Sequence, residues 1–258
     1  MGSRLKEQLR QNNLVRVFCL GQLCSPKLVE MIAMHGGYDG VWLDQEHGGL
    51  SIAQLENASR AARGCGLDTF VRLTATDYAT TMRPMEAGAG GIMAAQVRTA
   101  LEAEQIVRWC KFHPRGERGI NNTGVEGRYG RMPLLEYMKQ ANENSFIAIQ
   151  IENAAAVEEV EKIAAIPDID ILFVGPADLS QSLGIPAEWE HPLHWKAVER
   201  VAHACAKQGM NWATLPLNKD YARRCVDLGC TMLSLGIDVW IVNQGLKAFQ
   251  DEYSEFFS

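Results

Sequence analysis

The segment FIAIQIENAAAVEEVEKIAAIPDIDILFVG, residues 146–175, decides the fold class. It holds an apolar run at 146–152, a stretch with helical spacing at 154–165, and a second β-rich run at 171–175. Two neighbouring parallel strands need a long crossover connection of this kind, usually a helix. The segment therefore predicts a β–α–β unit.

The same alternation runs along the whole chain. Eight strands are predicted, at residues 15–20, 40–44, 69–73, 91–96, 146–152, 171–175, 211–215 and 232–236. Helical patterns lie near residues 26–36, 51–64, 78–88, 99–111, 154–165, 192–208, 219–228 and 239–250. Predicted helix starts carry the capping residues Ser25, Ser51 and Asp77. Predicted helix ends carry Gly36, Gly64, Gly88, Gly209 and Gly229.

Eight unbroken units favour a closed (β/α)8 barrel, the TIM barrel, over an open doubly wound sheet, which usually has about five or six strands. The length of 258 residues suits one complete barrel. No linker or internal repeat is visible, so we expect a single α/β domain over residues 1–258. One long loop, at about 114–133, is predicted to form an elaborated and functional rim.

The composition limits the partners. The formal net charge is −6 and no basic block occurs, which argues against nucleic acid or an anionic membrane as the main partner. The 7 cysteines are scattered and form no CxxC pair, as expected of free thiols in a reducing compartment. No stretch approaches the roughly 20 apolar residues of a membrane span. We expect a cytoplasmic protein with no membrane partner.

Two acidic residues follow neighbouring predicted strands. In barrels of this kind the chemistry lies at the carboxyl ends of the strands, and adjacent strands are about 4.8 Å apart. Glu152 and Asp178 can therefore share one ion, and two carboxylates suit a hard cation such as Mg²⁺ or Mn²⁺. For Asp178 alone, a helix N-cap or a rim salt bridge is the commoner role. Glu152 ends an apolar strand, where a charge needs a partner.

Three more groups follow strand ends. His47 lies in Asp44-Gln45-Glu46-His47-Gly48-Gly49, where Asp44 is a possible orienting carboxylate for a general base, although a lone histidine is more often structural. Arg72 offers a fork of donors for a carboxylate or an enolate oxygen, and a salt bridge to a neighbouring acid is an equal alternative. The Gly175–Asp178 segment presents free backbone N–H groups at a helix start, a natural anion site.

Several familiar motifs are missing. No glycine-rich phosphate loop follows a strand, no lysine stands at a predicted strand mouth, and no GxSxG elbow occurs. The mouths of the seventh and eighth strands, 214–217 and 235–238, also lack a glycine-rich phosphate cradle. These absences favour a small, unphosphorylated carboxylate substrate over a sugar phosphate, and they disfavour a Schiff-base aldolase.

Five segments together resemble one family. They are Tyr38-Asp39-Gly40-Val41-Trp42-Leu43-Asp44-Gln45-Glu46-His47, Val71-Arg72, His113-Pro114-Arg115-Gly116-Glu117-Arg118-Gly119, Gln150-Ile151-Glu152 and Gly175-Pro176-Ala177-Asp178-Leu179-Ser180. In order and spacing the chain resembles the HpcH/HpaI aldolase/citrate lyase family, specifically its metal-dependent class II pyruvate aldolases of the 2-keto-3-deoxy-sugar-acid or 4-hydroxy-2-oxo-acid type. The resemblance covers roughly residues 12–250.

The resemblance implies a phosphoenolpyruvate/pyruvate-type barrel with a metal at Glu152 and Asp178. The metal, Mg²⁺ or Mn²⁺ with Co²⁺ or Zn²⁺ as alternatives, acts as a Lewis acid for a pyruvate enolate. His47 matches the family's base, with Asp44 as its partner, and Arg72 matches the arginine beside the enolate oxygen. The implied reaction is reversible cleavage of a 4-hydroxy-2-oxo acid to pyruvate, or a close 2-oxo acid, and an aldehyde.

The resemblance also implies an assembly and further contacts. Members are commonly homohexamers, trimers of dimers that exchange the terminal helix, with a rim acid entering the neighbouring subunit's site. Glu86 occupies the position of that acid. The residues expected to bind substrate are Gln150, Gly175, Pro176, Ala177, Leu215 and Glu86.

The chain departs from the family pattern where an acceptor aldehyde would lie. Gln45 replaces the usual glycine, and Ala94-Ala95-Gln96-Val97 replaces the usual Val-Pro-Met-Val. These departures leave the aldehyde open. The alternatives are a CoA-thioester lyase or a decarboxylase of the same superfamily, or a non-catalytic barrel that binds a 2-oxo acid. The joint presence of Asp44, His47, Arg72, Glu152 and Asp178 argues against the non-catalytic reading.

Overall fold

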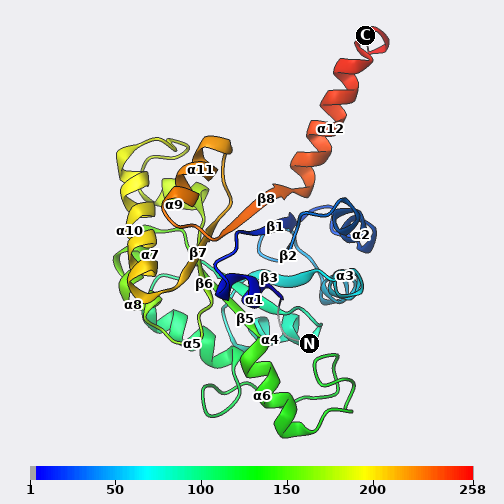
Figure 1. Ribbon diagram of the computed structural model, residues 1–258, viewed down its shortest axis with the longest axis vertical. Helices are drawn as coiled ribbons and strands as arrows, with labels where there is room; N and C mark the ends of the chain where they lie inside the picture. Colours follow the sequence, from blue (N-terminus) through cyan, green and yellow to red (C-terminus); the bar gives the residue numbers. More distant parts are fainter. Residues whose placement is uncertain (1–3, 258) are drawn as a thin grey trace.

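The computed structural model describes residues 4–257 and forms a single α/β domain around a closed barrel of eight parallel strands (Figure 1). The strands pair in sequence order, and β8 pairs with β1 to close the barrel. Their bounds are β1 Val15–Leu20, β2 Gly40–Asp44, β3 Asp68–Thr74, β4 Gly91–Ala95, β5 Phe146–Ile151, β6 Ile171–Val174, β7 Asn211–Thr214 and β8 Met232–Ile237. The predicted barrel is confirmed, and every predicted strand end agrees to within one residue. The predicted domain limits extend into residues 1–3 and 258, which lie outside the described part.

Helices surround the barrel (Figure 1). They are α1 Arg4–Arg10, α2 Pro26–His35, α3 Ile52–Gly64, α4 Tyr78–Glu86, α5 Ala100–Cys110, α6 Leu134–Asn144, α7 Ala154–Glu158, α8 Val160–Ala164, α9 Pro176–Ser182, α10 Pro192–Gln208, α11 Lys219–Asp227 and α12 Asp238–Glu252, followed by the 3₁₀ turn η1 Ser254–Phe256. The side chains of Ser25, Ser51 and Asp77 cap the N-termini of α2, α3 and α4 as predicted. None of the described helices is long and apolar enough to cross a membrane.

Two apolar layers explain why the strands read as nearly continuous hydrophobic runs. Side chains that point outward pack under the helices, and side chains that point inward fill the barrel. The interior contains the large rings of Trp42, Phe70, Phe146 and Phe173. Helix α1, which was not predicted because it is short and mostly polar, contributes Leu5 and Leu9 to the same interior cluster.

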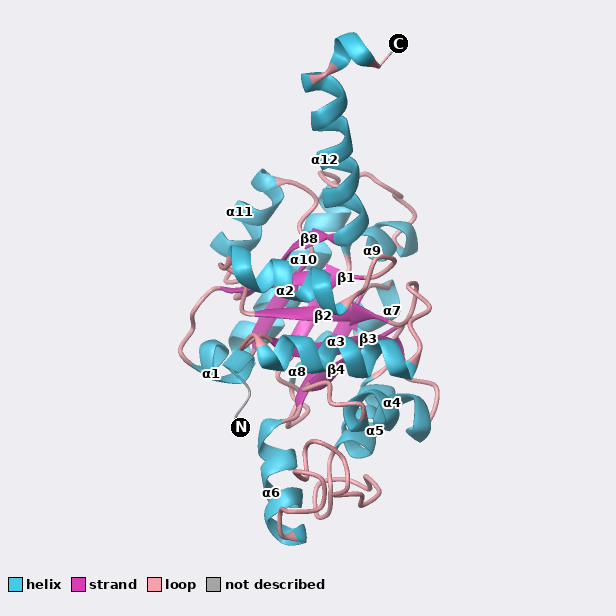
Figure 2. Ribbon diagram, turned by 90° about the vertical axis from the view of Figure 1, so that its right-hand side faces the viewer, coloured by secondary structure: helices cyan, strands magenta, loops and turns pink. Residues whose placement is uncertain are grey.

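The segment between β4 and β5 leaves the barrel and returns. It contains α5, the predicted loop and α6, and the loop and α6 lie at one end of the molecule in both ribbon views (Figure 2). Helix α6 was not predicted, and its Tyr137 and Ala141 pack with Phe112 and Met132 in a separate small core. The long loop is therefore an ordered part of the domain with its own buried cluster.

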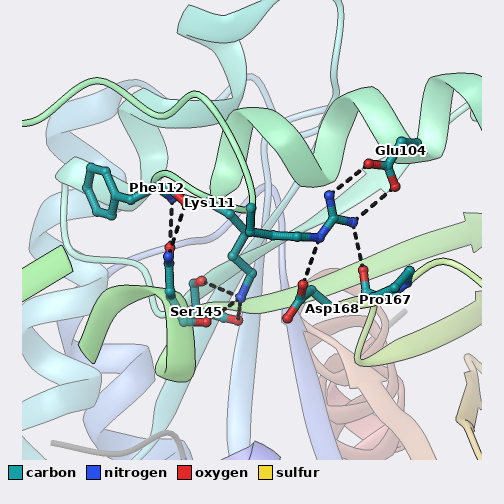
Figure 3. Close-up of polar contacts among 8 residues, drawn as sticks. Glu104, Lys111, Phe112, Ser145, Pro167 and Asp168 are labelled. Carbon is teal, nitrogen blue, oxygen red and sulfur yellow. Dashed lines mark hydrogen bonds and ion pairs between the residues drawn. The ribbon is translucent and has the colours of Figure 1, made fainter. Parts of the chain in front are cut away.

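Two cations brace this excursion, and one of them also reaches the segment before β6 (Figure 3). Arg115 pairs with Glu104 at 2.7 Å and with Asp168 at 2.8 Å. Buried Lys111 donates to the carbonyl oxygen of Asn142 at 2.6 Å and to Oγ of Ser145 at 3.0 Å, at the C-terminus of α6. A cation at a helix C-terminus satisfies carbonyl groups that lack partners within the helix.

Lys111 should make stability depend on pH. Burial, aided by the charge of Lys6, lowers the pKa of Lys111 to about 8 from its ordinary value of 10.5. The unfolded chain then binds more protons than the folded chain between these values, so this group's contribution to the free energy of unfolding rises with pH across that window. In Lys111→Met we expect that rise to be absent, as measured by urea unfolding at pH 7.5 to 10.5. A wild-type and variant difference that is constant with pH would contradict the expectation.

Candidate active site

Arg72, at the end of β3, holds two acids that follow β2. Its Nε lies 3.0 Å from Oδ1 of Asp44 and its Nη2 lies 2.7 Å from Oδ2, a bidentate pair. Nε also lies 3.4 Å from Oε2 of Glu46, and the guanidinium stands 4.9 Å above the ring of Trp42. The salt-bridge alternative for Arg72 is therefore confirmed, and the mostly buried cation lies between two acids at the barrel mouth.

Glu152 directly follows β5 and is only 1% exposed. Its Oε1 accepts a hydrogen bond from the backbone N–H of Gln96 at 2.7 Å, and its Oε2 accepts one from the amide of Gln150. Burial, together with the charges of Glu46 and Asp178, raises the pKa of Glu152 to about 7. Among residues 4–257 no lysine or arginine forms an ion pair with this carboxylate, so its neighbourhood is short of positive charge.

Gly175 makes the approach to Glu152 possible. A Cβ atom at this position would stand 2.7 Å from Nε2 of Gln150 and 2.9 Å from Oε2 of Glu152. Any larger residue would push the β6 segment away from the two side chains. Pro176 and Ala177 follow at the start of α9, so the predicted helix start is confirmed, and the binding of substrate by this segment stays a prediction.

Asp178 does not cap a helix. Helix α9 begins at Pro176, its N-cap residue is Gly175, and no side chain caps it. The carboxylate is partly exposed and raises the pKa of Glu152, which places the two charges close together. Neither a hydrogen bond nor an ion pair engages Asp178 in the described part of the chain. The capping and salt-bridge interpretations are therefore wrong, and Asp178 is available as a ligand.

His47 lies on the rim, with 62% of its side chain exposed. Its backbone N–H donates to Oδ1 of Asp44 at 3.2 Å, and its Nε2 lies 3.8 Å from Oε2 of Glu46. Asp44 thus contacts this residue through the main chain, whereas Glu46 is the carboxylate facing the imidazole. Glu46 was noted in the sequence but assigned no role, because only the folded turn shows which of the two acids faces the ring.

Of the remaining predicted residues, Gln150 contacts Glu152, whereas Leu215 and Glu86 have other neighbours. The buried Oε1 atom of Gln150 and the buried Oε2 atom of Glu46 have no hydrogen-bond partner, which leaves acceptors beside Glu152. Leu215 follows β7 and packs against the barrel interior. Glu86, at the end of α4, instead accepts a hydrogen bond from Asn121 of the long loop at 3.2 Å.

Two residues at which the sequence departs from the family pattern support the site through the backbone. Gln96 has a positive φ of 60°, uncommon for a residue other than glycine, and this backbone directs its N–H toward Glu152. Gln45 donates its N–H to the carbonyl oxygen of Arg72 at 2.9 Å and its amide to that of Leu50 at 3.0 Å. A cavity of about 360 Å³ lies next to Gln96, with Thr74, Ala95 and Trp109 in its wall.

The donor set fits a hard divalent cation. The charge of Asp178 acts on the buried carboxylate of Glu152, and Oε1 of Gln150, next to Glu152 in the strand, is an oxygen acceptor without a hydrogen bond. In residues 4–257 no group of three or more His, Cys, Asp or Glu side chains has metal-binding geometry. Substrate oxygens and water would have to complete the coordination, as is common where Mg²⁺ takes part in catalysis.

Comparison with known proteins supports the same grouping. The family model described as HpcH/HpaI aldolase/citrate lyase matches residues 16–244. The chain is similar to a 5-keto-4-deoxy-D-glucarate aldolase of Klebsiella pneumoniae, 28% identical over 93% of each chain. The crystal structure of an HpcH/HpaI aldolase from Desulfitobacterium hafniense DCB-2 superposes with a TM-score of 0.89, at 28% identity and over 96% of this chain and 97% of the other. That of the citrate synthase SbnG gives a TM-score of 0.88, at 27% identity and over 98% of each. The chain thus belongs to the HpcH/HpaI aldolase/citrate lyase family.

Proposed function

We propose that this protein is a divalent-metal-dependent aldolase that cleaves a 4-hydroxy-2-oxo acid to pyruvate, or a close 2-oxo acid, and an aldehyde. The observation that carries the proposal is Glu152, a buried carboxylate that forms no ion pair within residues 4–257 and whose pKa is raised by burial and by the charges of Glu46 and Asp178. Family relatives include pyruvate aldolases as well as a citrate synthase.

Each residue has a distinct part in the cleavage. Glu152 and Asp178 would hold the cation, which when bound supplies Lewis acidity toward the 2-oxo group of the substrate. His47 accepts the proton of the 4-hydroxyl group as the bond between C3 and C4 breaks and the aldehyde forms. The electron pair moves to the C2 oxygen, where the guanidinium of Arg72 stabilises the enolate. The enolate then takes a proton at C3 to give pyruvate, and the steps reverse for synthesis.

A second candidate function is carbon–carbon bond formation or cleavage on a citrate-type substrate. The close superposition with the citrate synthase SbnG favours it. Both reactions pass through an enolate, so the buried site alone is compatible with each. They differ in whether the protein deprotonates pyruvate, since a pyruvate aldolase must exchange the C3 protons of pyruvate without any second substrate.

The test is a pyruvate-release assay over a panel of 4-hydroxy-2-oxo acids with Mg²⁺, Mn²⁺, Co²⁺ or Zn²⁺ and with EDTA. We expect release that requires a metal and that EDTA stops. Exchange of the C3 protons of pyruvate in D₂O, followed by proton NMR, should show the same metal requirement. Release that persists in EDTA, or no exchange with any of the four metals, would reject the aldolase assignment.

We further propose that α12 joins two copies of the chain. The helix projects beyond the barrel (Figures 1 and 2). Its exposed apolar residues are Trp240, Ile241, Val242, Leu246 and Phe249. Such a surface is typical of an obligate interface. The hexamer implied by the family resemblance, with Glu86 approaching a neighbouring site, would bury it.

The variant Phe249→Glu should weaken this association, because a charge would replace a ring at the interface. We expect light scattering after size exclusion to give a smaller assembly than for the wild type. Leu135→Glu, at an apolar residue of α6 that is more exposed than Phe249, is the control and should leave the mass unchanged. A wild-type protein that elutes as one subunit would contradict the proposal.

A further inference from the structure

Asp238, the first residue of α12, is a buried acid at the mouth of the barrel that the proposed reaction does not use. It is 2% exposed. Its Oδ2 accepts hydrogen bonds from the backbone N–H groups of Gly21 at 2.8 Å and Leu23 at 2.7 Å, and its Oδ1 accepts one from Val239 at 2.8 Å. Only the bond to Val239 is local, and no side chain caps the N-terminus of α12, so helix capping does not explain these bonds.

The loop that Asp238 holds is the one that packs against the turn of His47. Gln22, between the two bonded residues, donates its side-chain amide to the carbonyl oxygen of His47 at 3.1 Å. A Cβ atom on Gly48 would stand 3.1 Å from the carbonyl oxygen of Gly21 and would overlap the backbone of Asp44. The backbones of the loop at 21–23 and of the turn at 44–48 are therefore in direct contact.

Asp44 and Asp238 lie on either side of this contact. A Cβ atom on Gly21 would stand 3.9 Å from Oδ2 of Asp44 and 3.9 Å from Oδ1 of Asp238. Asp44 fixes the turn from within, through its bonds to Arg72 and to the N–H of His47. Asp238 fixes the opposing loop, because it accepts hydrogen bonds from the backbone of Gly21 and Leu23, which follow β1. The exposed imidazole thus depends on main-chain anchors for its position.

We propose that Asp238 is a positioning residue for His47. The carboxylate fixes the loop at 21–23 by hydrogen bonds. This loop in turn fixes the turn at 44–48, which carries His47. This inference rests on the proposed function in assigning His47 the role of base. Displacement of a reacting group by about 1 Å can cost roughly 10²-fold in rate. Loss of the hydrogen bonds between Asp238 and the loop should therefore slow proton transfer to His47. Metal binding should be unaffected, because Glu152 and Asp178 follow β5 and β6.

The experiment is a double-mutant cycle with Asp238→Asn and His47→Ala. An asparagine keeps one acceptor oxygen but loses the second and the charge. We expect kcat for metal-dependent cleavage to fall about 10- to 100-fold in Asp238→Asn, while KM and the Mn²⁺ dissociation constant stay within about twofold. In the His47→Ala background the same substitution should have no further effect. An equal loss in both backgrounds would overturn the proposal.

A readout without turnover separates this proposal from the proposed function. Hydrogen–deuterium exchange of the segments at 21–23 and 44–48 should speed up in Asp238→Asn even if no substrate is ever found. Unchanged exchange there would overturn the positioning role. Gln22→Ala, at an exposed residue, is a second variant with little risk to folding, and it should lower kcat in the same direction and lose its effect when His47 is absent. An additive effect would count against the proposal.

Asp39→Asn is the matched control. Asp39 is also buried and accepts a backbone N–H bond, from Arg16 at 2.9 Å, but it precedes β2 at the opposite end of the barrel. Its loss should lower the melting temperature without changing kcat or exchange at 44–48. A comparable fall of kcat in this variant would show that loss of any buried acid has the same effect, and it would overturn the assignment.

Discussion

Glu152→Gln is expected to remove metal-stimulated cleavage, with a loss of at least about 10²-fold in kcat/KM. The amide keeps the shape and can still accept the hydrogen bond of Gln96, so the substitution removes the charge while leaving the local structure in place. A cation ligand that is neutral binds Mg²⁺ and Mn²⁺ far less well than a carboxylate. The measurements are turnover at saturating metal and direct Mn²⁺ binding.

The fold should survive this change. Burial and the nearby acids raise the pKa of Glu152 to about 7, so the charged form is disfavoured and we expect the fold to tolerate a neutral side chain. We expect the melting temperature in EDTA to be equal to or above that of the wild type. Glu104→Gln, on the outer helix α5, is the control and should keep full activity. Full activity of Glu152→Gln with unchanged Mn²⁺ affinity would reject the metal site.

His47→Ala should slow cleavage by roughly 10²–10⁴-fold, the usual contribution of a general base. The loss should fall on kcat, because the proton moves only as the carbon–carbon bond breaks. Mn²⁺ affinity should stay near that of the wild type, since the ring lies on the rim beside Glu46 rather than beside Glu152. The measurement is steady-state kinetics with the best substrate of the panel.

An exposed histidine elsewhere provides the control. His203→Ala, on α10, should leave kcat unchanged because its side chain is exposed on an outer helix. If His47→Ala retains the wild-type rate, another group takes the proton and His47 has no catalytic role. Oxaloacetate decarboxylation needs no proton transfer from a hydroxyl group. Its rate in His47→Ala should be compared with the rate of aldol cleavage, to identify the step in which His47 takes part.

The barrel could be predicted because its signals are local and repeated. Each strand is a short apolar run, and most helices begin or end at a residue with a known capping role, such as Ser51 in its capping box. The failures are elements that depend on tertiary contacts. Leu5 and Leu9 of α1 are buried only because they pack against the barrel interior. Helix α6 packs on a small core to which the long loop contributes.

The residue types of the candidate site could be predicted from the sequence, but several of their contacts could not. Spacing could not separate a ligand from a cap at Asp178, and the absence of any cap bond in α9 resolved that question. Spacing also suggested that Asp44 faces the ring of His47, whereas Asp44 is occupied by Arg72 and Glu46 faces the ring. Asp238 stands at the mouth of the eighth predicted strand but was assigned no role, because its partners lie more than 200 residues away in the chain.

The sequence by itself determined the (β/α)8 barrel, the strand ends at which polar groups gather, and the identity of the acids at Glu152 and Asp178, since these depend on periodicity and residue type. Only the tertiary structure decided which carboxylate is short of positive charge, which acid faces His47, and that Gln96 and Asp238 brace the site. The reason is physical. Charge compensation and backbone hydrogen bonds are settled between segments from different strands, and their energies depend on distances that no local pattern of residues encodes.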